Sequence, residues 1–162
     1  YVYNALAAAA VGRIYGLSIE EIKRGYSKAW RRSSGRFKMI ETDKFLVVDD
    51  CYNANPMSMK ASLDVLHDGE GRRVAILGDM GELGENEIAL HEEVGTHAAQ
   101  CGIDVCICVG ALSVHMAEAA RKADQEFKVI YEESRESLLE HLGDLVQEGD
   151  TILVKASPFH AV

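Results

Sequence analysis

The sequence predicts an α/β fold with a mostly parallel sheet and helices on both faces. From Phe45 onward, short apolar runs alternate with amphipathic segments of about a dozen residues, which is typical of strand–helix–strand units. Most apolar runs are followed by polar or glycine-rich residues, where ligands bind in sheets of this kind. Hydrophobic residues make up 48% of the 162-residue chain, so it has the material for a core and is not expected to be disordered. The predicted fold is Rossmann-like.

The first 36 residues differ in pattern from the rest of the chain. From Tyr1 to about Gly16 the chain is rich in alanine, the best helix former, so we expect a helix that starts before the sequence does. A capping-box pattern at residues 18–21 predicts a second, short helix that stops at Gly25. Basic and small residues at 28–36 are typical of a linker. We therefore expect a domain boundary within this linker.

Beyond the linker, each element is predicted from its own residue pattern. Strands are short apolar runs between turn residues, and helices have apolar residues at helical spacing, such as the four leucines of 134–146. Asn55 or Ser58 is expected to cap the first of these helices. Strands are expected at 37–41, 45–48, 73–77, 104–109, 128–131 and 151–154, and helices at about 55–67, 86–100, 113–123 and 134–146.

Composition and cysteine spacing exclude several kinds of protein. The formal net charge of −9 disfavours binding to duplex nucleic acid. No apolar run reaches the roughly 18 residues of a membrane span, and the chain does not start with a signal peptide. The four cysteines form no C-x-x-C pair, so we expect no zinc site and no disulfide framework. Cys106 and Cys108 are expected to share one face of a strand, and a reducing cytoplasm is the simpler location.

The most informative segment is residues 49–58, which follow an apolar strand. Its two carboxylates, Asp49 and Asp50, are able to accept hydrogen bonds from a ribose or a cation, and its amides, Asn53 and Asn55, suit a polar ligand. The alternative is turn and helix-cap chemistry, with Pro56 in the first helical position. Composition alone favours this alternative.

Other strand ends carry weaker signals. The glycine-rich residues 78–84 match neither a dinucleotide fingerprint nor a P-loop, and no glycine in the chain precedes a lysine. Acidic side chains there would suit an ammonium group, or the segment is a simple turn. His91 is expected to be structural. Lys155, at the end of the last strand, would contact an anion or face solvent. Arg36 belongs to a basic cluster that suits a small anion or serves as a solvated linker.

Taken together, these segments resemble one family, the Mur ligases, of the type that adds D-alanyl-D-alanine (MurF type). Residues 49–58 are similar to its D-D-x-Y-N-A-N-P-x-S motif. Residues 76–84 with the downstream Leu90-His91 and Glu93-Val94-Gly95 resemble its next signature. Matching segments also include the S-G-R of residues 34–36, residues 2–11 and residues 149–157. After Ser157 the chain departs from the family pattern, which puts any substrate contact from residues 158–162 in doubt.

The resemblance implies that residues 1–32 are the end of the central, ATP-binding domain and that residues 33–162 are the C-terminal domain. It implies a cytoplasmic ligase that uses ATP and Mg²⁺ to join D-alanyl-D-alanine to UDP-N-acetylmuramoyl-tripeptide through an acyl phosphate. The P-loop and the magnesium ligands are expected upstream of Tyr1, so the isolated fragment is expected to be inactive. The competing hypothesis is a non-catalytic Rossmann-like domain that binds a small ligand.

The resemblance also implies roles for six residues. Asn4 is expected to approach adenine, Arg36 to contact an ATP phosphate and Asp50 to contact the ribose. Lys155 is expected near the reacting end, as the catalytic residue of this fragment. The remaining two, Asn53 and Asn55, are expected to line the cleft for the dipeptide or the acyl group, and no metal ligand is expected in this chain.

Overall fold

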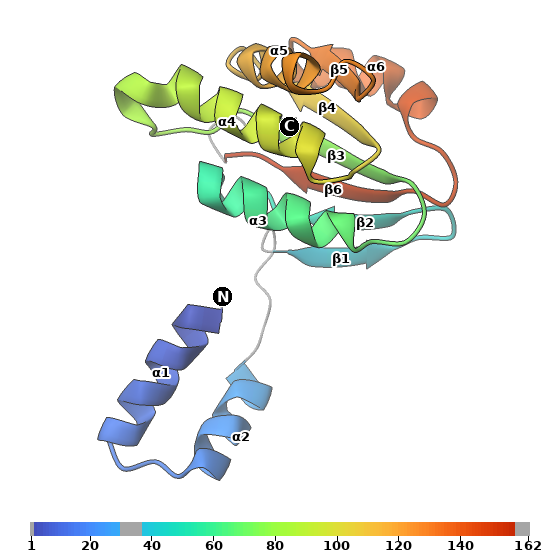
Figure 1. Ribbon diagram of the computed structural model, residues 1–162. Helices are drawn as coiled ribbons and strands as arrows, with labels where there is room; N and C mark the ends of the chain where they lie inside the picture. Colours follow the sequence, from blue (N-terminus) through green and yellow to red (C-terminus); the bar gives the residue numbers. More distant parts are fainter. Residues whose placement is uncertain (1, 30–36, 158–162) are drawn as a thin grey trace. The chain divides into compact units, whose positions relative to one another are not determined.

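The computed structural model describes residues 2–29 and 37–157, and within the first of these segments it describes side chains from Ala5 to Tyr26. The chain divides into two compact units, Tyr1–Ser33 and Ser34–Val162. The position of one unit relative to the other is not determined (Figure 1).

The first unit consists of two helices, α1 (Val2–Ile14) and α2 (Ile19–Ala29). The predicted capping box is confirmed: Glu21 N–H donates to Ser18 Oγ over 3.2 Å, and Ser18 N–H donates to Glu21 Oε2 over 2.8 Å. The Tyr26 hydroxyl donates to the carbonyl of Ala5 and so links the two helices. Gly25 does not end α2 as predicted, because a glycine inside a helix costs only about 1 kcal/mol relative to alanine.

The second unit is a six-stranded sheet in the order β1-β2-β6-β3-β4-β5. Only the pairing of β1 with β2 is antiparallel; the other four pairings are parallel, which confirms the predicted fold class. Figure 1 shows the helices against this sheet. The strands are β1 (Lys38–Glu41), β2 (Leu46–Asp49), β3 (Arg73–Gly78), β4 (Val105–Val109), β5 (Lys128–Glu132) and β6 (Thr151–Lys155), and the helices are α3 (Pro56–His67), α4 (Glu87–Gln100) after a short 3₁₀ turn at Gly84–Asn86, α5 (Ser113–Ala123) and α6 (Arg135–Leu145).

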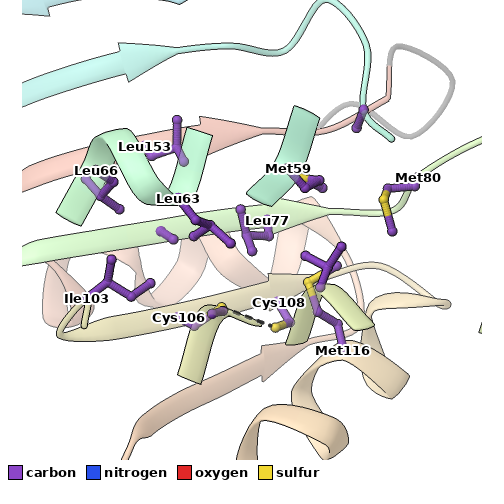
Figure 2. Packing of buried hydrophobic residues seen from close by; sticks show 14 of the residues in the cluster. Met59, Leu63, Leu66, Leu77, Met80, Ile103, Cys106, Cys108, Met116 and Leu153 are labelled. Atoms are coloured by element: carbon purple, nitrogen blue, oxygen red, sulfur yellow. Dashed lines mark hydrogen bonds between the residues drawn. The ribbon is translucent and has the colours of Figure 1, made fainter. Parts of the chain in front are cut away.

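Alternation along the strands produces two cores, one on each face of the sheet. In β3, Ala75 and Leu77 pack with helices α3, α4 and α5, whereas Val74 and Ile76 pack on the opposite face with α6. Cys106 and Cys108 both lie on the first of these faces, as predicted, with their sulfur atoms 3.6 Å apart and fully buried. Figure 2 shows the two thiols in that core together with three methionines, Met59, Met80 and Met116.

The strand order determines which loops become neighbours. Because β6 lies between β2 and β3 and runs parallel to both, the carboxyl ends of these three strands meet at one edge. The segment after β2, residues 50–55, is called the first loop below. The segment after β3, residues 79–83, is called the second loop. Ala156 and Ser157, at the end of β6, therefore lie between the two loops. Among the described helices, none is long and apolar enough to cross a membrane.

Candidate functional site

The first loop begins with a buried carboxylate, Asp50, which is 5% exposed. Its Oδ1 accepts a hydrogen bond from the backbone N–H of Phe37 over 3.0 Å. Its Oδ2 accepts one from the hydroxyl of Ser62 over 2.8 Å and one from the ammonium of Lys155 over 2.7 Å. A buried carboxylate stays ionised only when it is paired and hydrogen-bonded in this way. Asp50 thus joins the start of β1, helix α3 and the end of β6.

Lys155 is the cation of this pair and is 2% exposed. Besides the Asp50 carboxylate, its Nζ donates to the carbonyl oxygen of Asp50 over 3.3 Å and to that of Asn53 over 3.0 Å. An ammonium group has three donors, and these contacts use all three. The sequence alternative of a solvent-facing lysine is therefore wrong. The second sequence hypothesis was a contact with a phosphate or carboxylate, and within the chain the carboxylate of Asp50 is that partner.

Above this buried pair, the first loop presents exposed polar groups. Asn53 and Asn55 are both exposed. Asn55 caps helix α3: its Oδ1 accepts from Ser58 N–H over 2.9 Å, and Asn55 N–H donates to Ser58 Oγ over 3.1 Å. Pro56 follows in the first turn of the helix. The helix-cap reading of Asn55 is thus confirmed, and it leaves the loop rigid, with Asn53 at its exposed part.

The second loop is attached to helix α5 through Asp79, which is 4% exposed. Asp79 Oδ1 accepts from the backbone N–H of Ser113 over 2.7 Å and from its hydroxyl over 2.6 Å, and Oδ2 accepts from Leu112 N–H over 3.2 Å. A carboxylate at the positive end of a helix dipole is stabilised there. A Cβ added to Gly110 would lie 2.6 Å from Asp79 Oδ1, so glycine is required for this close approach. Asp79 therefore acts as a helix cap supplied by a distant strand.

His91 holds the next residue of the second loop. The imidazole is fully buried; Nε2 lies 3.0 Å from the backbone N–H of Met80, and Nδ1 lies 2.7 Å from the carbonyl of Glu87. Nε2 accepts and Nδ1 donates, which requires the neutral ring in a single tautomer. The structural role predicted for His91 is confirmed. Gly95, one turn further along α4, lets this helix approach α5, because an added Cβ would meet the Met116 carbonyl at 2.0 Å.

Cys51, the one thiol in the first loop, is not a nucleophile. Burial, together with the charge of Asp49 and a hydrogen bond with its side chain, raises the pKa of the Cys51 thiol to about 11. The thiol donates to the carbonyl of Val154 over 3.3 Å. Because the thiolate is the reactive form, this cysteine is a packing residue at neutral pH.

The structure thus brings Asp50, Asn53, Asn55 and Lys155 together at the carboxyl ends of β2 and β6, as the sequence predicted for the strand ends. Arg36 lies outside the described residues, and so does the side chain of Asn4, whose backbone belongs to α1. Ser62 was missed. Its spacing of four residues from Ser58 places both on one face of α3, the only signal that points to it.

Within residues 2–29 and 37–157, no group of three His, Cys, Asp or Glu side chains is arranged to hold a metal ion. The buried carboxylates Asp50 and Asp79 already accept from Lys155, hydroxyls and backbone N–H groups. The described donor set therefore does not fit a magnesium ion, and the polar side chains that the first loop leaves exposed are the amides of Asn53 and Asn55.

Comparisons with known proteins agree with this architecture. Residues 35–158 match the family described as Mur ligase, glutamate ligase domain. The chain is 35% identical over 159 residues to a UDP-N-acetylmuramoyl-tripeptide–D-alanyl-D-alanine ligase of Bacillus subtilis, covering 96% of this chain and 35% of that protein. The enzyme of the same name from Escherichia coli is 36% identical over 158 residues, covering 96% of this chain and 34% of that protein. The chain therefore spans about a third of the length of the curated relatives it matches.

Solved structures give the same picture. A crystal structure of MurF from Acinetobacter baumannii matches with a TM-score of 0.85 and 33% identity, covering 98% of this chain and 34% of that one. MurF ligase from Thermotoga maritima in complex with ADP matches with a TM-score of 0.72 and 29% identity, covering 96% of this chain and 34% of that one.

Proposed function

The chain belongs to the Mur ligase family, and from this premise we propose that it is the C-terminal domain of an ATP-dependent ligase that joins D-alanyl-D-alanine to UDP-N-acetylmuramoyl-tripeptide. Residues 1–32 are then the end of the ATP-binding domain. The observation that carries the proposal is the rigid first loop. Its side chains Asn53 and Asn55 are exposed, and the carbonyl of Asn53 accepts from the ammonium of the buried Asp50–Lys155 pair, at the strand ends where α/β folds bind ligands.

The nucleotide side of the proposal assigns Asp50 to the ribose of ATP. A carboxylate offers about four acceptor positions, and Asp50 uses three of them for Phe37, Ser62 and Lys155. One position is left for a ribose hydroxyl. Asn4 and Arg36 are proposed to meet adenine and a phosphate. Relatives support ATP as the nucleotide, since a MurF structure was solved in complex with ADP.

The dipeptide side of the proposal assigns Asn53 and Asn55 to the peptide groups of D-alanyl-D-alanine or of the acyl chain. Amide side chains both donate and accept, which matches peptide groups. Because Asn55 is held by its capping box and Asn53 Oδ1 accepts from the backbone N–H of Ala54, little side-chain ordering remains to oppose binding. In this proposal the protein is cytoplasmic, where UDP-linked precursors and ATP are available.

The reaction we propose has two steps. The terminal carboxylate of the tripeptide attacks the γ-phosphorus of ATP and displaces ADP, which gives an acyl phosphate. The amine of D-alanyl-D-alanine then attacks the acyl carbon, phosphate leaves, and the amine loses a proton. This domain would contribute orientation and the exclusion of water, both large effects in such transfers. In this proposal the magnesium ligands are supplied by the rest of the enzyme, and no group of three candidate ligands in the described residues is arranged to hold a metal ion. The catalytic role predicted for Lys155 from the sequence is not part of this proposal, because the ammonium is buried and its three donors are used within the chain.

The test compares the full-length protein that contains this chain with the isolated chain. In a phosphate-release assay, the full-length protein should turn over only when ATP, UDP-muramoyl-tripeptide and D-alanyl-D-alanine are all present. The isolated chain should give background, because no P-loop lies in its 162 residues. Turnover by the isolated chain, or none in the full-length protein with all three substrates, would contradict the proposal. The latter result, with ligand binding intact, would favour the non-catalytic domain instead.

A further inference from the structure

We propose that Lys155 is a positioning residue of the candidate site, whose ammonium holds the first loop in its binding conformation without touching the reacting atoms. The inference rests on the proposed function, which supplies the ligands, and on three features of the structure. First, the three donors of the ammonium are all used. Second, two of its acceptors are backbone carbonyls of the first loop. Third, β6 lies between β2 and β3, the strands that precede the two loops.

The ammonium of Lys155 has no capacity left for a substrate. Its three partners are the carboxylate and the carbonyl of Asp50 and the carbonyl of Asn53, at 2.7, 3.3 and 3.0 Å. The lysine side chain is 3% exposed, so no ligand reaches Nζ unless these contacts break. A lysine that neutralises charge on a transferring phosphate needs a free donor and an open approach. Lys155 has neither.

The partners of Lys155 are the points that define the shape of the loop. Two of the three acceptors are backbone carbonyls three residues apart, at Asp50 and Asn53. By binding both, the ammonium fixes the turn that contains Cys51 and Tyr52. The side chain of Asn53 is exposed, while its backbone carbonyl is held by the buried ammonium of Lys155. In this way Lys155 orients a side chain that we propose to contact the ligand.

The same strand end also holds the second loop. Two residues after Lys155, the backbone N–H of Ser157 donates to the carbonyl of Asp79 over 3.1 Å. Residues 155–157 therefore connect the first loop to the second, and a shift at Lys155 changes the separation of the two.

A matched control exists at the opposite edge of the sheet. Arg72 donates to Asp150 from Nε over 2.9 Å and from Nη2 over 2.8 Å, and also to the carbonyl of Leu145 over 2.8 Å. This pair is also a buried carboxylate with a cation that reaches a backbone carbonyl, but no loop of the candidate site touches it. Substituting its cation perturbs stability without perturbing the site.

The experiment uses the full-length ligase with Lys155→Met and, as the control, Arg72→Met. We expect Lys155→Met to raise KM for ATP or D-alanyl-D-alanine at least tenfold, with kcat reduced less than threefold and an unchanged pH profile of kcat. Arg72→Met should lower the melting temperature and leave both KM values within about twofold of the wild type. Lys155→Arg keeps the charge and should recover part of the loss in KM.

Two results would overturn the proposal. One is a fall in kcat of about a hundredfold or more with KM unchanged, which indicates a group acting on the reacting atoms. The other is a KM for both substrates that equals that of Arg72→Met. Where Lys155→Met does not fold, Ser62→Ala decides, because it removes another donor to the same Asp50 oxygen. Its KM should rise about two- to fivefold, and an unchanged KM counts against the proposal.

Hydrogen exchange separates this inference from the proposed function. In Lys155→Met the backbone amides of residues 51–55 should exchange at least tenfold faster than in the wild type, while Arg72→Met leaves them unchanged. This readout requires no turnover. A protein that lacks ligase activity but shows the exchange effect refutes the proposed function and keeps the role of Lys155 in holding the loop; unchanged exchange in Lys155→Met refutes that role.

Discussion

At the amino ends and at the carboxyl ends of the parallel strands, a buried carboxylate is paired with a cation. The two pairs hold different parts of the protein. At the amino edge, Arg72 and Asp150 join the start of β3 to the residue before β6. At the carboxyl edge, Asp50 and Lys155 join the ends of β2 and β6. The first pair connects only β3 and β6. The second connects strand β6 to a loop with two exposed amides, so only the second holds the groups that we propose to bind a ligand.

The comparison teaches that burial of a charged pair does not identify a functional residue. Both carboxylates are almost completely buried, at 5% exposure for Asp50 and 1% for Asp150. What differs is the cation's environment: the Arg72 side chain is 22% exposed, whereas that of Lys155 is 3% exposed. Function is better judged by the segment that the pair holds than by the pair itself.

The difference between the two pairs is tested by removing each cation and measuring the free energy of unfolding. In the 162-residue chain, Lys155→Met should lower the free energy of unfolding by about 3–5 kcal/mol, because it leaves Asp50 buried without a counter-charge. Arg72→Met should cost less, since water reaches that side chain more easily. Urea denaturation measures both. The double variant Asp50→Asn with Lys155→Met should regain part of the loss, and a fully additive cost would contradict the pairing.

A second test concerns Asp79, which follows β3. Its buried carboxylate accepts hydrogen bonds from the first backbone N–H groups of helix α5. Asp79→Ala should lower the free energy of unfolding by about 2 kcal/mol, because the N–H groups of Leu112 and Ser113 lose their acceptor. The neighbouring Glu82 is exposed, so Glu82→Ala is the matched control and should change stability by less than about 0.5 kcal/mol. Equal effects in thermal denaturation would refute the capping role.

A third test uses pH and acts at the amino edge. Burial by itself raises the pKa of Asp150, but hydrogen bonds from Arg72 and from Gln147 N–H outweigh it and hold the pKa below its usual range. The Arg73 side chain likewise lowers the pKa of Asp104. Carboxylates with a lowered pKa in the folded state stabilise it above their unfolded pKa, and this contribution is lost as pH falls through the folded pKa.

We therefore expect the free energy of unfolding to fall as pH drops below about 4. Asp150→Asn should flatten this decline, whereas Asn in place of the exposed Glu118 should leave it unchanged. Urea denaturation across that pH range measures the slope. A slope in Asp150→Asn equal to that of the wild type would show that the pair does not contribute.

The smallest expected effect is at Cys51. With a thiol pKa of about 11, less than about one part in a hundred is thiolate near pH 8, so alkylation in the folded chain should be far slower than in urea. Cys51→Ala should change ligase turnover of the full-length protein by less than about twofold. Mass spectrometry of alkylated peptides measures the rate, and rapid modification of Cys51 in the native chain would contradict the raised pKa of its thiol.

Features that depend on neighbours in the chain were predictable. The capping box at Ser18, the helix cap at Asn55 or Ser58, and the shared face of Cys106 and Cys108 were predicted from residues two or three positions apart. The one wrong boundary, Gly25, illustrates the weakness of local propensity: a single glycine is a small cost that the rest of a helix outweighs.

The contacts that make the site were not predictable in this way. His91 with Met80, and Gly95 against Met116, depend on how a loop and two helices come together in space. Ser62 gave almost no signal, because a serine on an otherwise apolar helix face resembles a tolerated polar residue until its carboxylate partner is known.

By itself the sequence determined the class of fold, the order of its strands along the chain and the segments at the strand ends, because hydrophobic period and caps are set by residues a few positions apart. Which residues of those segments contact each other depends on the tertiary structure. The placement of β6 between β2 and β3 brings Lys155 to Asp50, 105 residues away in sequence. Because both groups are buried, the two charges must pair with each other, so a lysine predicted to lie near substrate is instead bonded to the first loop.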